Sequence, residues 1–314
     1  MGEGIRGNEG VSAPALIGVD WGTTNFRAFL IGADGAILDR RSGPRGILTV
    51  EDGAFSAALR SQVGAWLDDG AAPVLLSGMI GSRQGWVETA YVTVPAGLED
   101  FAASLVEAPF EAADARIVPG VEMAGATMRD VMRGEETQIF GALAQAGAGE
   151  GRFLLPGTHA KWVSVEEGRI VHFSTYMTGE IFSAARHHTI LGRLMRGDGE
   201  DTPGFLHGVR DGARSGGPGA LLHRLFGVRT AGLFGDIADT ALADYLSGLL
   251  IGSEVADAGR TDARPVAIVA SDALAARYAA AAKEIGIAAS TVPSDCIALG
   301  YLAIARAAGL VAGN

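Results

Sequence analysis

Two short turns in the chain combine glycine with hydroxyl side chains, a combination that can hold phosphate. The first is Gly22-Thr23-Thr24-Asn25, and the second is Gly157-Thr158-His159, with Lys161 two residues further on. Glycine lets a ligand approach the backbone closely, so peptide N–H groups and threonine hydroxyls can surround phosphate oxygens. Gly-Thr pairs also occur in ordinary hairpin turns. For each turn taken alone, both interpretations stay open.

Three carboxylates stand where they could assist the transfer of a phosphoryl group. Asp20 ends an apolar strand, where a buried charge is costly unless it is paired or bound to metal. It could orient Mg²⁺ through water. Glu135 and Glu136 open a predicted helix, where a carboxylate can accept the proton of an attacking hydroxyl. The alternatives are a turn-capping Asp20 and two first-turn acids that complement the helix dipole.

A glycine-rich loop, 77–86, follows the apolar strand predicted at 74–76 and could bind an organic acid. Arginine can hold a carboxylate with two parallel hydrogen bonds, and backbone amides can bind further oxygens. An arginine that is simply exposed on the surface is the other interpretation. The candidate substrate contacts are Gly78, Met79, Ile80, Gly81, Ser82, Arg83 and Trp86, with Arg27 and Glu180 as secondary candidates.

The segments around the two glycine turns show the same order of predicted elements. Around the first turn, apolar residues predict strands at 16–20, 26–31 and 36–40. Around the second turn, they predict strands at 153–155, 162–165 and 169–173. The repeated pattern indicates an internal duplication, although one repeat of this kind can also arise by chance.

The rest of the chain alternates predicted helices and strands, as in α/β proteins. Apolar spacing predicts helices at 55–67, 100–107, 135–146, 180–194, 238–253, 271–283 and 294–308. Further strands are predicted at 116–118 and 265–269. Residues 196–218, rich in Gly, Asp and Arg, are expected to form a long loop. We place the domain boundary near 147–151, which gives a tail at 1–13 and domains at 14–147 and 148–314.

Bulk composition limits the class of protein. A chain of 314 residues is long enough for two domains. With 48% hydrophobic and 19% charged residues it is typical of globular proteins. A net charge of -11 argues against a nucleic-acid or anionic-membrane surface, and no apolar run reaches the length of about 20 residues that spans a bilayer. The single cysteine, Cys296, excludes disulfides within the chain and fits a reducing cytoplasm.

Six segments, in order along nearly the whole chain, resemble one known family. Residues 19–25 resemble the first phosphate motif of the actin, sugar kinase and Hsp70 superfamily, and residues 155–162 resemble the second. Within that superfamily, the form that the two motifs take here is similar to the 2-dehydro-3-deoxygalactonokinase family. The other matching segments are Leu76–Trp86, Asp130–Gln138, Met177–Glu180 and Tyr245–Gly252.

The resemblance implies two actin-like (RNase H-like) α/β domains with a cleft that holds ATP and Mg²⁺. It implies an ATP-dependent kinase that phosphorylates 2-dehydro-3-deoxy-D-galactonate at its C6 hydroxyl. Asp20 would hold the metal, and Glu135 or Glu136 would be the base, with Glu135 slightly favoured. The cofactor-binding residues would be Gly22, Thr23, Thr24, Asn25, Gly157, Thr158, His159, Lys161, Ala270 and Ser271.

The segment Ala270-Ser271-Asp272 departs from the family pattern, because relatives have a glycine-bearing turn against adenine there. The adenine contacts therefore stay open, although Ser271 can cap the helix that follows it.

Other functions fit the same residues. A kinase of another 2-keto-3-deoxy aldonate would differ in the recognition of one hydroxyl. A phosphohydrolase would use Glu135 or Glu136 to activate water, but would not need the loop 77–86. A non-catalytic actin-like protein should carry a regulatory appendage, such as a basic helix-turn-helix, which the sequence lacks. The expected partners are a sugar acid and ATP, not nucleic acid or membrane; a homodimer is left open.

Overall fold

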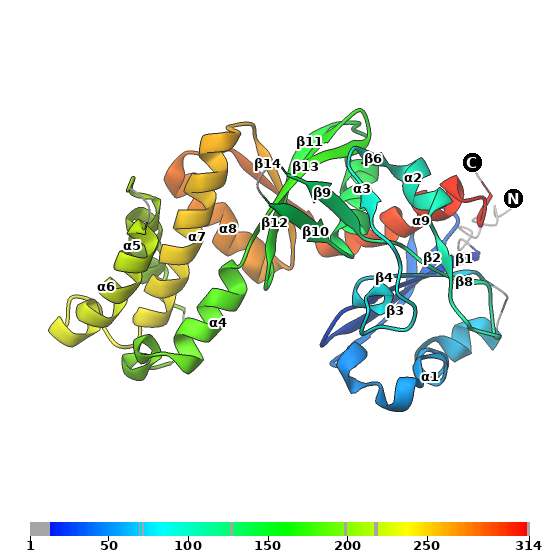
Figure 1. Ribbon diagram of the computed structural model, residues 1–314, viewed down its shortest axis with the longest axis horizontal. Coiled ribbons are helices and arrows are strands. Elements are labelled where there is room, and N and C mark those ends of the chain that lie inside the picture. The colour runs from blue at the N-terminus through cyan, green and yellow to red at the C-terminus, as the bar shows by residue number, and fades with distance from the viewer. Residues whose placement is uncertain are drawn as a thin grey trace, which may run out of the picture. The chain divides into compact units, whose positions relative to one another are not determined.

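A computed structural model describes residues 13–68, 70, 72–125, 128–197, 200–216 and 219–312 of the protein. The chain forms two compact units (Figure 1). Unit 1 is drawn from residues 1–122, 131–147 and 295–314, and unit 2 from residues 123–130 and 148–294. Within the described residues, no helix is long and apolar enough to cross a membrane.

Unit 1 is built on a six-stranded sheet in the order β3-β2-β1-β4-β8-β7. β1, β2 and β3 are antiparallel neighbours, and β4 and β8 continue the sheet with parallel pairing. Because β1 and β4 are parallel, the residues that follow them leave the sheet at the same edge. The strands are β1 Pro14–Trp21, β2 Phe26–Gly32, β3 Ile37–Gly43, β4 Val74–Ser77, β7 Val106–Glu107 and β8 Ala115–Ile117.

Side chains of β1 alternate between the two faces of this sheet. One face, which includes Val19, packs in an apolar cluster with helix α1 (Phe55–Asp68). Gly18 points to the other face, where a Cβ would lie only 2.3 Å from the ring of Tyr301. Asp20, two residues beyond Gly18, therefore belongs to the face that Tyr301 covers.

Two helices of unit 1, α3 (Glu135–Ala146) and α9 (Ile297–Ala307), pack closely on each other. A Cβ on Gly300 would lie 1.9 Å from the carbonyl oxygen of Thr137, so only glycine allows this approach. The sequence predicts the terminal helix in the second domain. The structure differs, because this contact joins residues 295–314 to unit 1.

Short elements complete this part of the chain. They are β5 Val92–Thr93, β6 Ala96–Gly97, β9 Val121–Ala124, β10 Arg129–Met132 and helix α2 Leu98–Ala103. β5 pairs with β9 in parallel. None of these strands is predicted from the sequence, because segments of two to four residues carry too little apolar pattern.

Five strands of unit 2 repeat the arrangement of five strands in unit 1 and lie in the order β15-β14-β11-β12-β13. β11, β12 and β13 are antiparallel neighbours, and β14 and β15 continue the sheet with parallel pairing. Five strands therefore follow the same order in each unit, as the repeated strand pattern of the sequence predicts. The strands are β11 Gly151–Leu155, β12 Ala160–Glu166, β13 Arg169–Tyr176, β14 Val266–Ala270 and β15 Ala289–Pro293.

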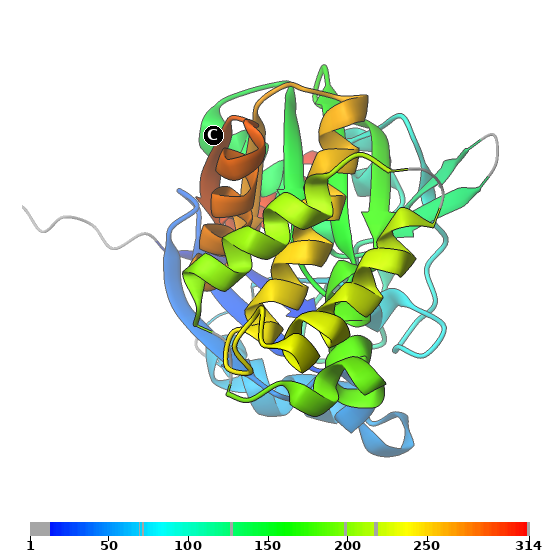
Figure 2. The ribbon, with the colours of Figure 1, turned by 90° about the vertical axis from the view of Figure 1, so that its left-hand side faces the viewer.

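The helices of unit 2 pack around α7, which contacts α4, α5, α6 and α8 (Figures 1 and 2). Side chains of α5, α7 and α8 form one apolar cluster with the strands, so these helices cover the sheet. The helices are α4 Thr178–His188, α5 Thr202–Ala213, α6 Ala220–Phe234, α7 Leu242–Thr261 and α8 Asp272–Ile285.

The long loop expected at 196–218 is wrong, because helix α5 occupies most of it. Asp201 caps this helix: its carboxylate accepts a hydrogen bond from the N–H of Gly204 at 2.5 Å. Pro203 stands in the first turn, where its missing N–H costs nothing. These start signals lie inside a segment whose glycine content indicates a loop.

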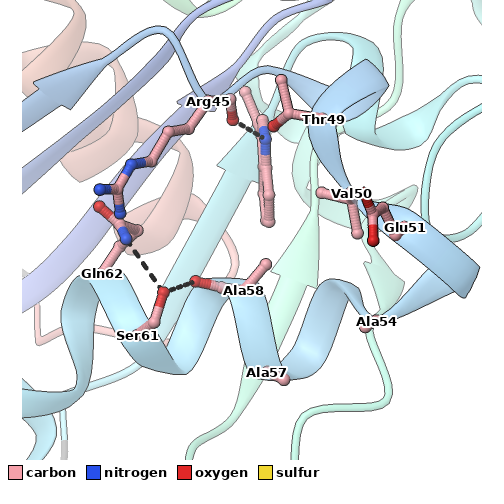
Figure 3. Close-up of a pocket in the computed structure, with 10 residues that line it drawn as sticks. Arg45, Thr49, Val50, Glu51, Ala54, Ala57, Ala58, Ser61 and Gln62 are labelled. Atoms are coloured by element: carbon pink, nitrogen blue, oxygen red, sulfur yellow. Dashed lines mark hydrogen bonds between the residues drawn. The ribbon is translucent and has the colours of Figure 1, made fainter.

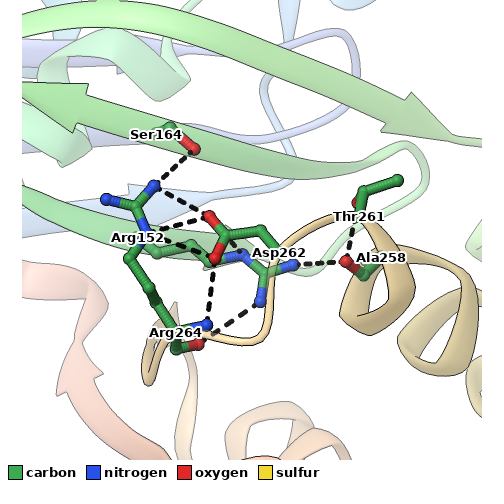
Figure 4. A network of polar contacts seen from close by, with 6 residues as sticks. All are labelled: Arg152, Ser164, Ala258, Thr261, Asp262 and Arg264. Carbon is green, nitrogen blue, oxygen red and sulfur yellow. Dashed lines mark hydrogen bonds and ion pairs between the residues drawn. The ribbon is translucent and has the colours of Figure 1, made fainter.

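A buried arginine of β11 ties the end of α7 to the sheet of unit 2 (Figure 4). Arg152 donates to the carbonyl of Ala258 at 2.8 Å, and its Nε lies 3.7 Å from the carboxylate of Asp262. Arg264 donates to the same carboxylate at 2.8 Å through Nη2. The guanidinium of Arg152 also lies over the ring of Trp162, 4.6 Å from its centroid. These contacts fix the last turn of α7.

The substitution Asp262→Asn is expected to destabilise unit 2 by about 1–2 kcal/mol at pH 7. Hydrogen bonds from Arg264 lower the pKa of Asp262 to about 2, from an ordinary 3.8. The ionised carboxylate therefore stabilises the fold above pH 3.8, and this contribution is lost as the pH falls through 2. Urea unfolding at pH 7 and pH 3 should show a smaller difference between wild type and variant at pH 3. Asp236→Asn, at an exposed position, is the control; an equal loss at both pH values would contradict the role of the charge.

Candidate active site

The first glycine turn, 22–25, joins β1 to β2 and is braced from one side. The N–H of Gly22 donates to the carbonyl of Asn25 at 2.9 Å. Carbonyl oxygens of residues 22–24 accept hydrogen bonds from the N–H groups of residues 46–48, at 2.9 to 3.3 Å. Thr23 and Thr24 remain exposed. The turn is therefore held by its carbonyls, while its hydroxyl side chains stay accessible to a ligand.

A cavity of about 330 Å³ lies beside Trp21, between the bracing segment and α1 (Figure 3). The indole N–H of Trp21 donates to the carbonyl of Arg45 at 2.9 Å, which anchors the segment that holds the glycine turn. Ser61 and Gln62 of α1, hydrogen-bonded to each other at 3.0 Å, form part of the opposite wall. Among the described residues, the predicted site residues do not line this cavity. Its walls support the turn.

Asp20, at the end of β1, forms an ion pair with Arg27, its neighbour across the β1–β2 pair. Both hydrogen bonds reach the same carboxylate oxygen: Nη2 lies 2.6 Å and Nε 3.0 Å from Oδ2. Arg27, predicted to contact sugar hydroxyls, thus compensates the charge of Asp20. Oδ1 of Asp20 faces Gly78, whose Cβ, if present, would lie 3.2 Å away.

Two glycines bring the start of α3 close to Asp20. Gly78, after β4, has a φ of 89°, and Gly134, before α3, has a φ of 105°. Both values favour glycine, because a side chain would be strained there. A Cβ on Gly134 would lie 3.1 Å from the Cα of Gly78 and 3.9 Å from Oδ1 of Asp20. The ends of β1 and β4 and the first turn of α3 therefore meet at one corner of unit 1.

Glu135 and Glu136, adjacent in the first turn of α3, differ in accessibility. Glu136 is 0% exposed, and its two carboxylate oxygens accept from the N–H of Gly134 at 2.9 and 2.7 Å. Burial, together with the charge of Glu135, raises the pKa of Glu136 to about 8. Glu135 is half-buried, and its carboxylate accepts from the N–H of Arg133 at 3.0 Å. Of the two, Glu135 alone presents a carboxylate that a ligand can reach.

Beneath Asp20 lies a buried polar pair that the sequence analysis missed. The hydroxyls of Ser77 and Tyr301 are 2.6 Å apart, and both residues are fully buried. Ser77 stands opposite Asp20 in the register of β1 and β4. Burial and the charge of Asp20 raise the pKa of Tyr301, so the phenol keeps its proton. A polar residue at the end of an apolar strand was the one available signal for Ser77.

Much of the predicted substrate loop packs inside unit 1. The N–H of Trp86 donates to the carbonyl of Ile80 at 2.8 Å. Ile80 and Gly81 are buried, and the ring of Trp86 stacks on Phe55 at a centroid distance of 6.2 Å. These residues therefore shape the loop from within.

The tip of the same loop is exposed. Arg83 is 87% exposed, and its Nε lies 3.5 Å from the carboxylate of Glu88. Ser82 closes the turn before it, because its hydroxyl donates to the carbonyl of Met79 at 2.7 Å. Arg83 is therefore accessible to an anionic ligand, but no rigid contact fixes its position.

Arg133 is a second arginine at this loop, and the sequence analysis missed it. Its guanidinium donates to the hydroxyl of Thr89 and, at 3.0 Å, to the carbonyl of the same residue. It lies over the ring of Tyr91, 4.4 Å from the centroid. Its Nε is buried and has no hydrogen-bond partner among the described residues. Its position two residues before Glu135 was the only signal in the sequence.

In unit 2, the start of α4 packs directly on the second glycine turn. A Cβ on Gly179 would lie 2.3 Å from the carbonyl oxygen of Gly157. The N–H of Glu180 donates to the carbonyl of Thr158 at 3.0 Å, and its carboxylate contacts Nε2 of His159 at 2.6 Å. Glu180, predicted to contact the sugar, thus lies beside the predicted phosphate turn. The N-terminus of α4 adds a partial positive charge there.

Lys161, predicted to contact the nucleotide, lies inside β12 and is buried. Its ammonium donates to the hydroxyl of Thr175 at 3.0 Å, across the β12–β13 pair. That hydroxyl donates in turn to Asp130 at 2.6 Å. Lys161 thus belongs to a polar chain within the sheet, and its contact with a nucleotide stays a prediction.

A cavity of about 250 Å³ lies next to the second glycine turn, between α4, α7 and α8. Ala270 and Ser271, predicted to lie against adenine, do not line it; the wall is formed instead by Leu274, Arg277 and Tyr278 on the next turns of α8. Ser271 is the N-cap of α8, but its side chain makes no capping hydrogen bond among the described residues. The cavity has apolar walls with a few polar groups, as ligand pockets commonly do.

Glu254 of α7 is buried next to this cavity and bonds side chains of the elements around it. Its carboxylate accepts from the indole N–H of Trp162 at 2.8 Å and from the hydroxyl of Tyr278 at 2.9 Å. It also bonds the side chain of Thr178, at the start of α4. Burial raises the pKa of Glu254 to about 7. The sequence offered no signal for this network, whose members lie on four elements.

Comparison with known proteins identifies the family. The sequence model described as 2-keto-3-deoxy-galactonokinase matches residues 20–304. The probable 2-dehydro-3-deoxygalactonokinase of Rhizobium meliloti (strain 1021) is 37% identical over 274 residues, 86% of this chain and 89% of the relative. The 2-dehydro-3-deoxygalactonokinase of Escherichia coli (strain K12) is 34% identical over 272 residues, 86% of this chain and 90% of the relative.

Solved structures agree on the fold. The crystal structure of a putative 2-dehydro-3-deoxygalactonokinase from Sinorhizobium meliloti superposes with a TM-score of 0.85 at 36% sequence identity. The superposition covers 93% of this chain and 98% of the other chain. The activator of 2-hydroxyisocaproyl-CoA dehydratase from Clostridium difficile has a TM-score of 0.50 at 14% identity, with 93% and 95% covered. The fold is therefore the actin-like α/β fold. The chain belongs to the 2-keto-3-deoxy-galactonokinase family and is a kinase with an alcohol group as acceptor.

Proposed function

We propose that the chain transfers the γ-phosphate of ATP to the C6 hydroxyl of 2-dehydro-3-deoxy-D-galactonate. The hydroxyl oxygen attacks the γ-phosphorus, the bond to the β,γ-bridging oxygen breaks, and the hydroxyl proton passes to a carboxylate. The products are the 6-phosphate of the sugar acid and ADP. The corner of unit 1 where Asp20 meets the first turn of α3 is the observation that most strongly supports this proposal.

The nucleotide would bind in unit 2. The cavity between α4, α7 and α8 has the apolar walls that suit an adenosine, and Gly157 of the second glycine turn lies at its edge. From there the phosphates would reach the N–H groups of the turn and the N-terminus of α4. Ser247 and Tyr278 are two of the polar residues that line the cavity, and they could orient the base or the ribose.

Mg²⁺ would be held by Asp20 together with phosphate oxygens and water. One carboxylate is enough, because Mg²⁺ usually keeps several waters and binds substrate phosphates. Oδ2 of Asp20 receives both bonds from Arg27, which leaves Oδ1 on the side of Gly78 and Gly134. The residues present therefore fit the ion, which when bound would neutralise negative charge on the phosphates.

The sugar acid would bind in unit 1. Arg83 is the accessible cation of the loop that follows β4, and Arg133 lies against the same loop. Either guanidinium could pair with the carboxylate of the substrate. Glu135 would accept the proton of the C6 hydroxyl, because Glu136 is sealed in the protein and its raised pKa keeps it protonated near pH 7. A cytoplasmic location is part of the proposal, and the single cysteine, Cys296, which is free and buried in the structure, is compatible with it.

A coupled assay of ADP release tests the proposal. With ATP, Mg²⁺ and a panel of 2-keto-3-deoxy aldonates, we expect kcat/KM for the D-galactonate derivative to exceed that for its stereoisomers by at least about tenfold. A higher value for another aldonate would assign a different substrate. Equal ADP release with and without a sugar acid would instead favour a phosphohydrolase.

The substitution Ser247→Trp, in the same assay, tests the nucleotide site. The indole would fill much of the 250 Å³ cavity, so KM for ATP should rise by about tenfold or more while KM for the sugar acid changes little. Ser56→Trp, on the exposed side of α1, is the matched control. An unchanged KM for ATP in Ser247→Trp would place the nucleotide elsewhere.

A further inference from the structure

Arg277 of α8 is fixed at the wall of the cavity between α4, α7 and α8. Its Nη1 donates to Oδ1 of Asp244 at 2.8 Å, and its guanidinium lies over the ring of Phe205, 4.4 Å from the centroid. The hydrogen bond acts in the plane of the guanidinium and the ring covers one of its faces, so the two contacts together fix its position and its tilt. The side chain is still 31% exposed. The reaction steps proposed above give this residue no role.

Asp244, near the start of α7, anchors the guanidinium from inside the protein. Its side chain is 1% exposed, and its Oδ2 accepts from the N–H of Asp201, the N-cap of α5, at 2.8 Å. These contacts join three helices that pack on one another, α5, α7 and α8 (Figure 2). A buried ion pair stabilises a fold little compared with apolar residues of similar size. Holding Arg277 in place therefore accounts for the pair better than stability does.

The guanidinium of Arg277 lies towards the end of the cavity that is remote from the second glycine turn. Glu254 bonds the side chain of Thr178, at the start of α4, which packs on that turn. Asp244, the partner of Arg277, precedes Glu254 by ten residues, which is about 15 Å along α7. Phosphates bound at the glycine turn would therefore place the base of the nucleotide towards Arg277.

One face of this guanidinium is available to a flat ligand. Phe205 is 3% exposed and covers the other face. Among the described residues, Arg277 lines the cavity and Phe205 does not. The face opposite Phe205 is therefore the one that a ligand in the cavity can cover. Guanidinium planes stack on aromatic rings, and a nucleobase offers such a ring.

We propose that the adenine ring of ATP stacks on the guanidinium of Arg277, and that Asp244 is the positioning residue that holds this guanidinium. The inference rests on the nucleotide site proposed above and names the group that recognises the base there. It differs from the prediction that adenine lies against Ala270 and Ser271, neither of which lines the cavity among the described residues.

The substitution Arg277→Lys tests the stacking. Lysine keeps a positive charge for Asp244 but has no planar group, so KM for ATP should rise at least about fivefold, with the loss on KM rather than on kcat. In the coupled ADP-release assay, the inhibition constant of adenosine against ATP should rise by the same factor. That of inorganic tripolyphosphate should stay the same. An unchanged constant for adenosine, or a rise for tripolyphosphate alone, overturns the stacking.

Arg210→Lys is the matched control. Arg210 also joins α5 to α8, through an ion pair with Glu284 at 3.0 Å, but it does not line the cavity among the described residues. The inhibition constants of adenosine and tripolyphosphate should both keep their wild-type values. Thermal unfolding of both variants separates a loss of fold from a loss of contact with the base.

The substitution Asp244→Asn tests the positioning role. Asparagine has one acceptor oxygen where the carboxylate uses two, so it cannot hold both Arg277 and the N–H of Asp201. The inhibition constant of adenosine should rise as in Arg277→Lys, and the double variant should be no weaker than Arg277→Lys alone. A lower melting temperature with an unchanged constant for adenosine would show a purely structural role. Effects that multiply in the double variant would also contradict the positioning role.

The variant Ser247→Trp separates this inference from the proposed function. If Ser247→Trp raises KM for ATP and Arg277→Lys does not, the nucleotide site stands and the stacking is wrong. If neither variant changes KM for ATP, the nucleotide binds elsewhere and both proposals fail.

Discussion

Replacing Glu135 with glutamine is expected to lower kcat by about 100- to 10,000-fold, the usual contribution of a general base. Glutamine keeps the shape of the side chain and can still accept the hydrogen bond from the N–H of Arg133, but it cannot take the proton of the attacking hydroxyl. KM values should change little, since the loss falls on the chemical step. The coupled ADP-release assay with the sugar acid measures both quantities.

The adjacent variant Glu136→Gln is the matched control, and it should retain much of the rate. Glu136 is fully buried and, with a pKa of about 8, is protonated at pH 7. Glutamine therefore resembles the form that the wild type already carries. If Glu136→Gln loses the rate and Glu135→Gln retains it, the assignment of the base is reversed.

A pH series of unfolding measurements on Glu136→Gln checks its structural role. A carboxyl whose pKa is raised on folding binds its proton more tightly in the folded state, so wild-type stability should fall as the pH rises from about 4.5 to about 8. The variant lacks this group and should lose less over the same range. Parallel curves for the two proteins would contradict the burial of a protonated Glu136.

The local sequence pattern is sufficient to predict the strands near each glycine turn. Alternating apolar residues and an Asp-Gly loop predict the antiparallel strands around the first turn, because these signals act between neighbours in the chain. The helix predicted at 135–146 has those same bounds in the structure. The repeat of the strand pattern also predicts the matching order of the two sheets.

Glycine content misled the prediction of α5. Glycine is typical of loops, yet the glycines of α5 recur every four residues along one side of the helix. A Cβ on Gly208 would lie 2.1 Å from the carbonyl oxygen of Tyr245, and one on Gly212 would lie 2.1 Å from that of Leu249. They allow α5 to approach α7 closely. Composition cannot separate the two uses of glycine, because the distinction lies in a partner helix more than 30 residues away.

The missed site residues share a different cause, which is distance along the chain. Ser77 and Tyr301 form one hydrogen bond but are separated by 224 residues. The cavity of unit 2 combines helices α4, α7 and α8, and Glu254, which supports it, bonds side chains of α4, α8 and β12. Tyrosine or glutamate in a predicted helix has many ordinary roles. Only the tertiary structure shows which of them meet.

The substitution Asp20→Asn is expected to cause the second large loss of rate. Asparagine has the same size and can still accept hydrogen bonds from Arg27. It removes the negative charge that would attract Mg²⁺ and the ion pair between Asp20 and Arg27. We expect kcat to fall by about 100- to 1,000-fold, and the Mg²⁺ concentration for half-maximal rate to rise at least about tenfold.

A titration of Mg²⁺ at saturating ATP and sugar acid separates the metal role from a structural one. Asp39→Asn is the control, because Asp39 is an exposed carboxylate of unit 1 that also accepts a side-chain hydrogen bond, from Trp66 at 2.9 Å. It should leave the Mg²⁺ dependence unchanged. If Asp20→Asn lowers kcat but keeps the wild-type Mg²⁺ dependence, then Asp20 acts by orienting Arg27 and the start of α3, and the metal is held by other groups.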